Sequence, residues 1–141
     1  MIRAKCSRML ADRDEAQDVA QETFLRLWRS GVADLEPAVL TAWIYRTSTR
    51  LAVDRLRQRR FSVNVAEPPE GSTPGAAALV EARRELERIA RSVPAAELRA
   101  AILHRFDRMG QQEVAEILGS SERTVRRLLE RFDRRMEEVR E

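Results

Sequence analysis

Arginine is the residue whose type and spacing most clearly predict chemistry in this sequence. Near the C-terminus, arginines recur at steps of one, three and four residues, in a segment that also carries apolar residues at helical spacing. The arginines are Arg123, Arg126, Arg127, Arg131 and Arg134, and the apolar stripe is Val125, Leu128, Leu129, Phe132, Met136 and Val139. A helix with this pattern buries the stripe and presents guanidinium groups on its other side. Because guanidinium pairs with guanine edges and phosphates, the segment predicts a helix that reads DNA.

The residues before this helix predict the turn that positions it. The run from Gln112 to Leu118 has helical spacing, and Gly119, Ser120 and Ser121 follow it. Two short helices joined at a glycine-bearing turn are typical of a helix-turn-helix, and Ser121 is suited to cap the second helix.

The charge balance of this region leaves a second interpretation open. Ten arginines and ten acidic residues lie between Pro94 and Glu141, and the acids Glu122, Glu130 and Asp133 stand among the arginines. Each acid would repel phosphate if it faced the DNA backbone, so the affinity of this segment alone should be modest. An Arg-rich amphipathic helix can also be the solvated face of an ordinary bundle.

A second basic segment lies in the middle of the chain. Between residues 46 and 60 there is one acid, Asp54, and there are six arginines: Arg46, Arg50, Arg55, Arg57, Arg59 and Arg60. The peptide dipole favours cations at a helix C-terminus, which explains the last arginines but not the first two. We interpret the segment as a nucleic-acid surface.

Composition excludes several classes of function. The 141 residues are 43% apolar and 35% charged, with a net charge of +3, which is typical of a soluble globular protein. One cysteine, Cys6, and one histidine, His104, provide neither a disulfide nor metal-ligand spacing, and the five glycines form no phosphate-binding loop. We therefore expect no metal, no cofactor and no small-molecule substrate, a structural His104, and a function based on binding and not on catalysis. The chain has no long apolar run and no signal-peptide core, which predicts a cytoplasmic protein away from membranes.

Helical periodicity predicts an all-α chain. The first clear helix begins at Asp12, with Glu15 as a capping-box partner, and ends near Gly31. Its apolar positions are Ala16, Val19, Ala20, Thr23, Phe24, Leu27 and Trp28. The outer face carries Asp14, Asp18, Gln21, Glu22 and Leu25, and is either ordinary surface or a docking face for a basic partner helix. The next helix runs from about Pro37 to Arg60 and packs through Leu40, Trp43, Ile44, Thr47, Leu51 and Val53 or Leu56.

A linker divides these helices from the C-terminal ones. Residues 67–75 are rich in proline and glycine, and helical spacing resumes at Ala76 and again at Pro94. We expect two small helical domains, residues 1–62 and 76–141, joined by a flexible linker of residues 63–75. The second domain contains the helix-turn-helix.

Three blocks of this sequence resemble extracytoplasmic-function sigma factors of the sigma-70 family. They are Asp14 to Trp28 (DEAQDVAQETFLRLW), then Ala42 to Arg46 (AWIYR) with Leu51 to Arg57 (LAVDRLR), and then the helix-turn-helix. The blocks follow the family's order at about its spacing, and they cover nearly the whole chain apart from the linker.

The resemblance implies a bacterial initiation factor that binds core RNA polymerase, directs it to promoters and helps to separate the strands. The face formed by Asp14, Asp18, Gln21, Glu22 and Leu25 is similar to the surface that grips the clamp helices of the largest polymerase subunit. The helix from Trp43 to Arg60 would face the minus-ten element, and the loop from Gln58 to about Val63 would lie near an extruded base. The residues that match the reader of the minus-35 element are Ser121, Arg123, Thr124, Arg126, Arg127 and Arg131. The resemblance leaves an anti-sigma factor open as a further partner.

Some residues depart from the family pattern. Arg50 stands where an asparagine associated with the minus-ten strand is usual, so recognition of that element is expected to change. Leu128 replaces a residue that is often basic, and Ser120 one that is commonly aliphatic. About ten residues precede Asp12, fewer than the family normally has, so we expect either a start further upstream or a shortened member.

Two other functions stay open on the sequence. The first is a stand-alone helix-turn-helix regulator, or a non-initiating decoy, that binds DNA without core polymerase. The second is an interaction module that binds polymerase or another protein and never touches DNA.

Overall fold

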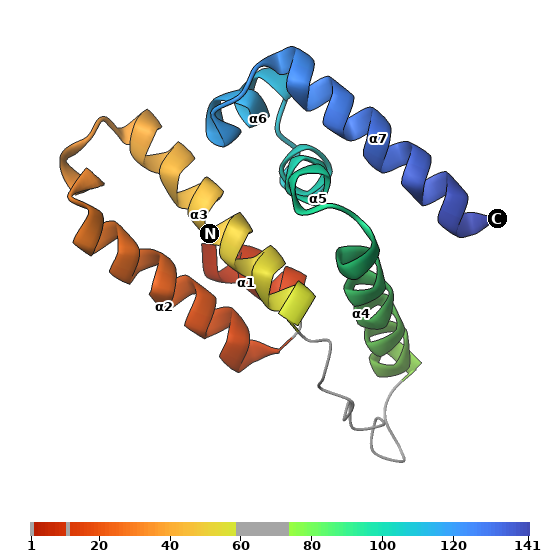
Figure 1. The fold of residues 1–141 in the computed structure, drawn as a ribbon. Coiled ribbons are helices and arrows are strands. Elements are labelled where there is room, and N and C mark those ends of the chain that lie inside the picture. The colour runs from red at the N-terminus through yellow and green to blue at the C-terminus, as the bar shows by residue number, and fades with distance from the viewer. Residues whose placement is uncertain (1, 11, 59–73) are drawn as a thin grey trace.

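The computed structural model describes residues 2–10, 12–58 and 74–141, and most of these residues lie in helices (Figure 1). The α-helices are α1 (Ile2–Leu10), α2 (Arg13–Ser30), α3 (Pro37–Gln58), α4 (Pro74–Ser92), α5 (Ala95–Ala101), α6 (Gln111–Leu118) and α7 (Glu122–Arg140). A 3-10 turn, Val32–Asp34, lies between α2 and α3, and a π-helical turn, Ile102–Phe106, continues α5. No strand occurs in these ranges, so the predicted all-α class is confirmed.

Capping residues set both ends of α2 as predicted. Asp12 Oδ1 accepts hydrogen bonds from the backbone N–H of Asp14 at 2.9 Å and of Glu15 at 3.2 Å. At the other end, Gly31 adopts a left-handed φ of 71°. The bonds to Asp12 satisfy backbone N–H groups that the helix itself leaves unpaired, and the left-handed conformation of Gly31 ends the helix.

The packing faces of α2 and α3 differ from those the sequence predicted. On α2, Phe24 is 50% exposed and Trp28 is 84% exposed, although both belong to the predicted apolar face. On α3 the fully buried side chains are Ser48, Thr49, Ala52, Val53 and Leu56. The predicted contacts Leu40, Trp43, Ile44, Thr47 and Leu51 are only partly buried. The nine residues of α1 cannot cover an 18-residue helix, because each residue adds only about 1.5 Å of length.

The sequence did not predict α1, because its buried face contains a lysine. Lys5 is 2% exposed, and its Nζ donates a hydrogen bond to the carboxylate of Asp107, 102 residues away. The same Nζ lies 5.1 Å from the centroid of the Tyr45 ring. Burial lowers the pKa of Lys5, while the Asp107 carboxylate opposes that shift. A buried charge requires such a partner, so Lys5 helps to specify how α1 meets the second half of the chain.

One of the hydrophobic core clusters contains residues from both halves of the chain. The cluster of buried side chains in α1–α3 also contains four residues from the second half, Ala90, Val93, Leu98 and Ile102. Polar contacts cross the same boundary, since Arg57 Nη1 donates to the backbone oxygen of Val93 at 3.1 Å. The helix α3 therefore packs against α1 and α2 and also against α4, α5 and α6 (Figure 1).

The predicted linker lies mostly outside the described residues. Residues 63–73 are not described, and α4 already begins at Pro74, so Pro74 and Gly75 belong to a helix and not to the linker. A helix tolerates proline in its first turn, because the backbone N–H of a residue there has no acceptor within the helix. The domain boundaries 1–62 and 76–141 stay predictions.

Candidate nucleic-acid interface

The helix-turn-helix forms at the residues that the sequence predicted. Gly119 has a left-handed φ of 65°, and the N–H of Ser120 donates to the oxygen of Ala115 at 3.0 Å. Ser121 then caps α7, its Oγ accepting a hydrogen bond from the N–H of Thr124 at 3.1 Å. A separate core cluster ties α6 to α7; its buried residues include Val114, Ala115 and Ile117 from α6, and Val125 and Leu129 from α7. The turn and the cap thus fix the direction of α7 relative to α6.

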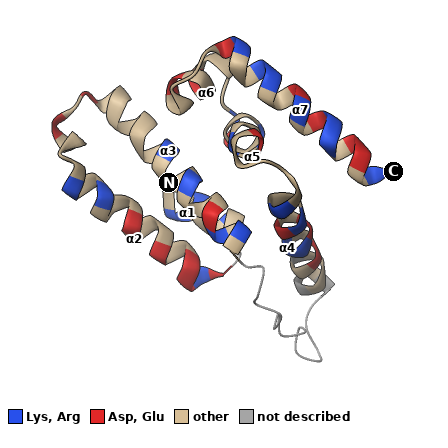
Figure 2. Cartoon of the chain, in the orientation of Figure 1, with Lys and Arg blue, Asp and Glu red and all other residues tan. Residues whose placement is uncertain are grey.

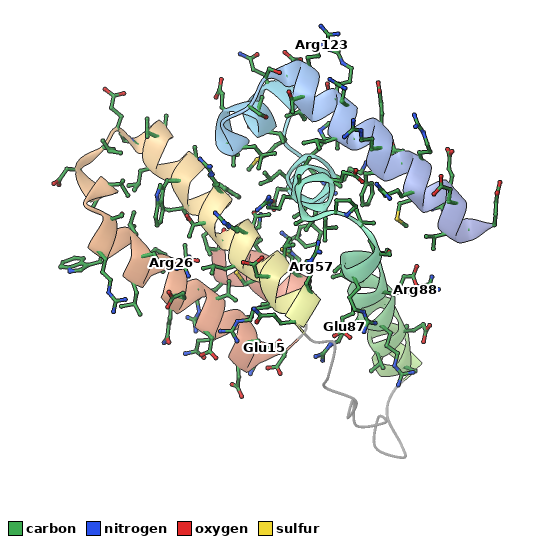
Figure 3. All side chains as sticks on the ribbon, viewed as in Figure 1. Glu15, Arg26, Arg57, Glu87, Arg88 and Arg123 are labelled. Atoms are coloured by element: carbon green, nitrogen blue, oxygen red, sulfur yellow. The ribbon has the colours of Figure 1, made fainter. Side chains whose placement is uncertain are left out.

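The arginines of α7 lie on its solvent side. The exposed residues along this helix include Arg123, Thr124, Arg126, Arg127, Arg131 and Arg134. Figure 2 shows basic and acidic residues alternating along α7, and Figure 3 shows Arg123 at the end where α7 begins, directed away from the rest of the chain. The predicted buried stripe is confirmed for Val125 and Leu129, but it stops before Val139, which is 41% exposed.

One of the three acids among these arginines is paired elsewhere. Asp133 accepts a hydrogen bond from Arg105, which lies in the π-helical turn after α5. Glu122 and Glu130 are exposed. Arg135 of α7 is likewise paired with an acid outside the helix, Glu97 of α5. One acid and one arginine of α7 are thus each neutralised, so these two pairs leave the charge balance of the helix unchanged.

Removing the Ser121 cap is expected to weaken the structure of this region. Ser121→Ala should lower the free energy of unfolding by about 1 kcal/mol, because the N–H of Thr124 loses its acceptor. Urea denaturation of the full chain measures this. The matched control is Ser92→Ala, since Ser92 Oγ donates to the backbone oxygen of Ile89 at the end of α4 and does not cap the start of a helix. An equal loss of stability in both variants would contradict the capping role.

The basic residues of α3 divide into two groups. Arg46 and Arg50 are exposed, whereas Arg55 and Arg57 are partly buried. Arg57 reaches from α3 toward the junction of α4 and α5, consistent with its bond to Val93 (Figure 3). Arg59 and Arg60, together with the predicted loop from Gln58 to Val63, fall outside the described residues apart from Gln58. Arg46 and Arg50 are therefore the most exposed of the described basic side chains on α3.

The partly buried Arg99 lies near Arg46 and Arg50, and the sequence did not predict this cluster. Arg99 lies on α5 and, with Arg46 and Arg50, lines a cavity between α3, α5 and the turn that precedes α7. Burial and the charge of Arg50 lower the pKa of Arg99, whereas Asp54 opposes that shift. Local sequence patterns carry no signal for this cluster, because it depends on how α5 packs on α3.

The predicted docking face of α2 is accessible. Asp14, Asp18, Gln21 and Leu25 are exposed, and Glu22 is partly exposed while it accepts a hydrogen bond from Arg26 Nε at 2.9 Å. Beside them, Phe24 and Trp28 line an apolar cavity of about 680 Å³ together with Arg3, Gln17, Ala20, Gln21 and Leu25. Acidic groups next to exposed aromatic rings suit contact with a basic, partly apolar protein surface.

The exposure of Trp28 leads to a stability prediction. Trp28→Ala should change the free energy of unfolding by less than about 0.5 kcal/mol, because surface side chains contribute little to folding. Leu56→Ala serves as the comparison and should cost about 2–5 kcal/mol, since Leu56 is fully buried. Urea denaturation of both variants checks this, and a large loss in Trp28→Ala would show that Trp28 packs against the chain in solution.

The side chains of His104 and Cys6, which could in principle take part in catalysis, have structural surroundings. His104 Nδ1 lies 2.7 Å from the backbone oxygen of Met109, which agrees with a structural role. Cys6 is fully buried, and burial raises the pKa of its thiol, so it is a poor nucleophile. Among the described helices, none is both long and apolar enough for a membrane span.

Comparison with known proteins agrees with this arrangement. The family model for sigma-70 region 2 matches residues 1–62, and that for a homeodomain-like domain matches residues 94–138. The chain is similar to the ECF RNA polymerase sigma factor SigL of Mycobacterium tuberculosis, with 31% identity over an alignment of 127 residues that covers 84% of this chain and 71% of SigL.

Two other relatives are matched over smaller shares of their length. The probable RNA polymerase sigma factor RfaY of Xanthomonas campestris is 29% identical over an alignment of 126 residues that covers 82% of this chain and 32% of RfaY. The ECF RNA polymerase sigma factor SigW of Bacillus subtilis is 36% identical over 55 residues, 39% of this chain and 29% of SigW. The matched segments thus span about a third of these two relatives. From the helix-turn-helix, the sigma region 2 match and the similarity to SigL along most of both chains, we conclude that this chain belongs to the extracytoplasmic-function RNA polymerase sigma factors of the sigma-70 family, which are not enzymes.

Proposed function

We propose that this chain initiates transcription by binding core RNA polymerase and directing it to specific promoters. The observation that carries the proposal is the exposed row of arginines at the start of α7, held by a complete helix-turn-helix. In this proposal Arg123, Thr124, Arg126, Arg127 and Arg131 meet the minus-35 element, where bidentate guanidinium contacts read guanine and phosphate contacts set the register. Ser121 caps the start of α7 and is exposed beside these residues.

Core polymerase is the proposed partner of α2. Asp14, Asp18, Gln21, Glu22 and Leu25 would meet the clamp helices of the largest subunit, with Leu25 as an apolar anchor in a rim of polar groups. An interface of this kind depends on a few buried anchors, while the surrounding polar contacts exclude water. The exposed carboxylates also favour a basic partner and speed its association.

The minus-ten element is the proposed partner of α3. Arg46 and Arg50 would hold the backbone of the opening duplex, together with Arg55, Arg57, Arg59 and Arg60 as far as each is free to reach it. Two modest DNA contacts on one chain reinforce each other through effective concentration, above all when polymerase holds the chain. Since both proposed partners, polymerase and promoter DNA, are in the cytoplasm of bacteria, we propose that the protein acts there.

Run-off transcription tests the proposal. Core polymerase, with and without the full chain, would transcribe a pooled library of promoter-sized fragments, and the transcript ends would be sequenced. We expect defined start sites that share two sequence elements about one and a half to two turns of DNA apart. DNA binding by the chain without such transcripts would favour a stand-alone regulator, and polymerase binding without them would favour a decoy or an interaction module.

A further inference from the structure

Three arginines from both halves of the chain meet in one cavity. The cavity has a volume of about 280 Å³ and is lined by Arg46 and Arg50 of α3, Arg99 of α5, and Ser120, with Leu118 and Leu128 on its apolar side. Arg46 lies close to the turn of the helix-turn-helix, since a Cβ built on Gly119 would be 3.6 Å from Arg46 Nη1. The cavity thus exists because the second half of the chain packs on α3.

These arginines lack the acidic partners that other arginines have. Within the described residues, no carboxylate forms an ion pair with Arg46, Arg50 or Arg99. Five other arginines each form an ion pair with Asp or Glu: Arg26, Arg83, Arg88, Arg105 and Arg135. The charges of Arg50 and Arg46 act on Arg99 and add to the burial that lowers its pKa, and Asp54 offsets them only in part. The cluster is therefore a region of unbalanced positive charge.

We propose that this cavity is a binding site for a compact phosphate-bearing ligand. Guanidinium groups bind phosphate oxygens through paired, charge-assisted hydrogen bonds, and the hydroxyl of Ser120 adds a further donor. The volume falls just below the roughly 300–1,000 Å³ typical of sites for drug-sized ligands, so it suits a small polyanion. The proposal is independent of promoter recognition by α7.

Binding there would stabilise the packed arrangement of the two halves. A phosphate held by α3 on one side and by α5 and the turn on the other neutralises like charges that otherwise repel. A ligand that binds only the folded, packed chain raises its thermal stability in proportion to the logarithm of ligand concentration. The ligand would also occupy Arg46 and Arg50, which the proposed function assigns to promoter DNA.

A phosphate of the DNA backbone forms the same hydrogen bonds with guanidinium groups as a small free ligand does. Two features of the cavity favour the small free ligand over DNA. Arg99 is not among the residues predicted to bind DNA, and the cavity is formed between α3, α5 and the turn before α7 instead of running along one exposed helix. Replacing Arg99 therefore separates the two sources, because the variant leaves Arg46, Arg50 and the arginines of α7 unchanged.

Isothermal titration calorimetry of the full chain with inorganic tripolyphosphate, at constant ionic strength, tests the site. Arg99→Gln should weaken binding about tenfold or more, the change expected for one lost charge-assisted hydrogen bond. The matched control is Arg91→Gln, an exposed arginine on α4, which should bind as the wild type does. Equal affinity in wild type and Arg99→Gln, or equal weakening in both variants, would overturn the proposal.

Two further measurements are needed. One distinguishes loss of binding from misfolding of the variant, and the other distinguishes a free ligand from DNA as the source of the phosphate. Tripolyphosphate should raise the melting temperature of the wild type but not that of Arg99→Gln, and Ser120→Ala should weaken binding without loss of helical signal. A short DNA duplex of arbitrary sequence should bind wild type and Arg99→Gln equally. If Arg99→Gln weakened duplex binding as much as tripolyphosphate binding, the cavity would be part of a DNA surface and the free-ligand proposal would be wrong.

Discussion

Replacing Arg126 and Arg127 together with alanine is expected to reduce promoter-dependent transcription by about a hundredfold or more. Each arginine that contacts a base or phosphate contributes about 1–3 kcal/mol, and both side chains are exposed near the start of α7. Alanine is a strong helix former, so α7 and the core that it shares with α6 should persist. Run-off transcription on a promoter found with the wild-type chain measures the effect.

The salt dependence of DNA binding gives a second measure of the same contacts. If both arginines neutralise phosphates, the slope of log affinity against log salt should fall by about one unit for each. The matched control is Arg134→Ala with Arg140→Ala, which removes equal charge from the far end of the same helix. Unchanged transcription in Arg126→Ala with Arg127→Ala, or equal losses in both double variants, would show that this part of α7 does not read the promoter.

The combination of Glu22→Arg and Leu25→Asp is expected to weaken binding to core polymerase by about a hundredfold or more. Anchors at the centre of an interface contribute about 2 kcal/mol or more, and reversal of a charge adds repulsion from a basic partner. Leu25 is 49% exposed and Glu22 is partly exposed, so neither change disturbs the core. Fluorescence anisotropy of the labelled chain, titrated with core polymerase, measures the affinity.

A matched pair with the same chemistry and spacing lies elsewhere on the surface. Glu36→Arg with Val39→Asp replaces an exposed acid and an exposed aliphatic residue three positions apart, at the start of α3. This control should bind core polymerase as the wild type does. Unaltered affinity in Glu22→Arg with Leu25→Asp would mean that α2 is not the docking helix.

Structural features that depend only on residues close together in the sequence could be predicted from the sequence. The cap at Asp12, the left-handed Gly31 and the turn from Gly119 to Ser121 all occur where residue type and spacing indicated. The exposure of the α7 arginines likewise follows from a period of 3.6 residues, because one side of that helix is apolar and buries Val125 and Leu129.

The errors occurred where burial depends on distant segments. Phe24 and Trp28 fit an apolar stripe by spacing, but they are 50% and 84% exposed. In α3 the buried face includes Ser48 and Thr49, because α3 is enclosed from two sides and small polar residues permit close approach. Periodicity identifies a candidate face, but the neighbouring helices decide how much of it is buried.

The sequence by itself determined the helices after α1, several of their ends and the row of arginines on α7, because each depends on residues within about four positions of one another. It also contained the blocks that indicate the family. Only the tertiary structure decided that α1 exists as a packed helix with Lys5 bound to Asp107, and that Arg99 meets Arg46 and Arg50 across the two halves. The physical reason is that these contacts join residues far apart in the chain. Their formation depends on the shape and charge of surfaces that exist only after the helices have packed.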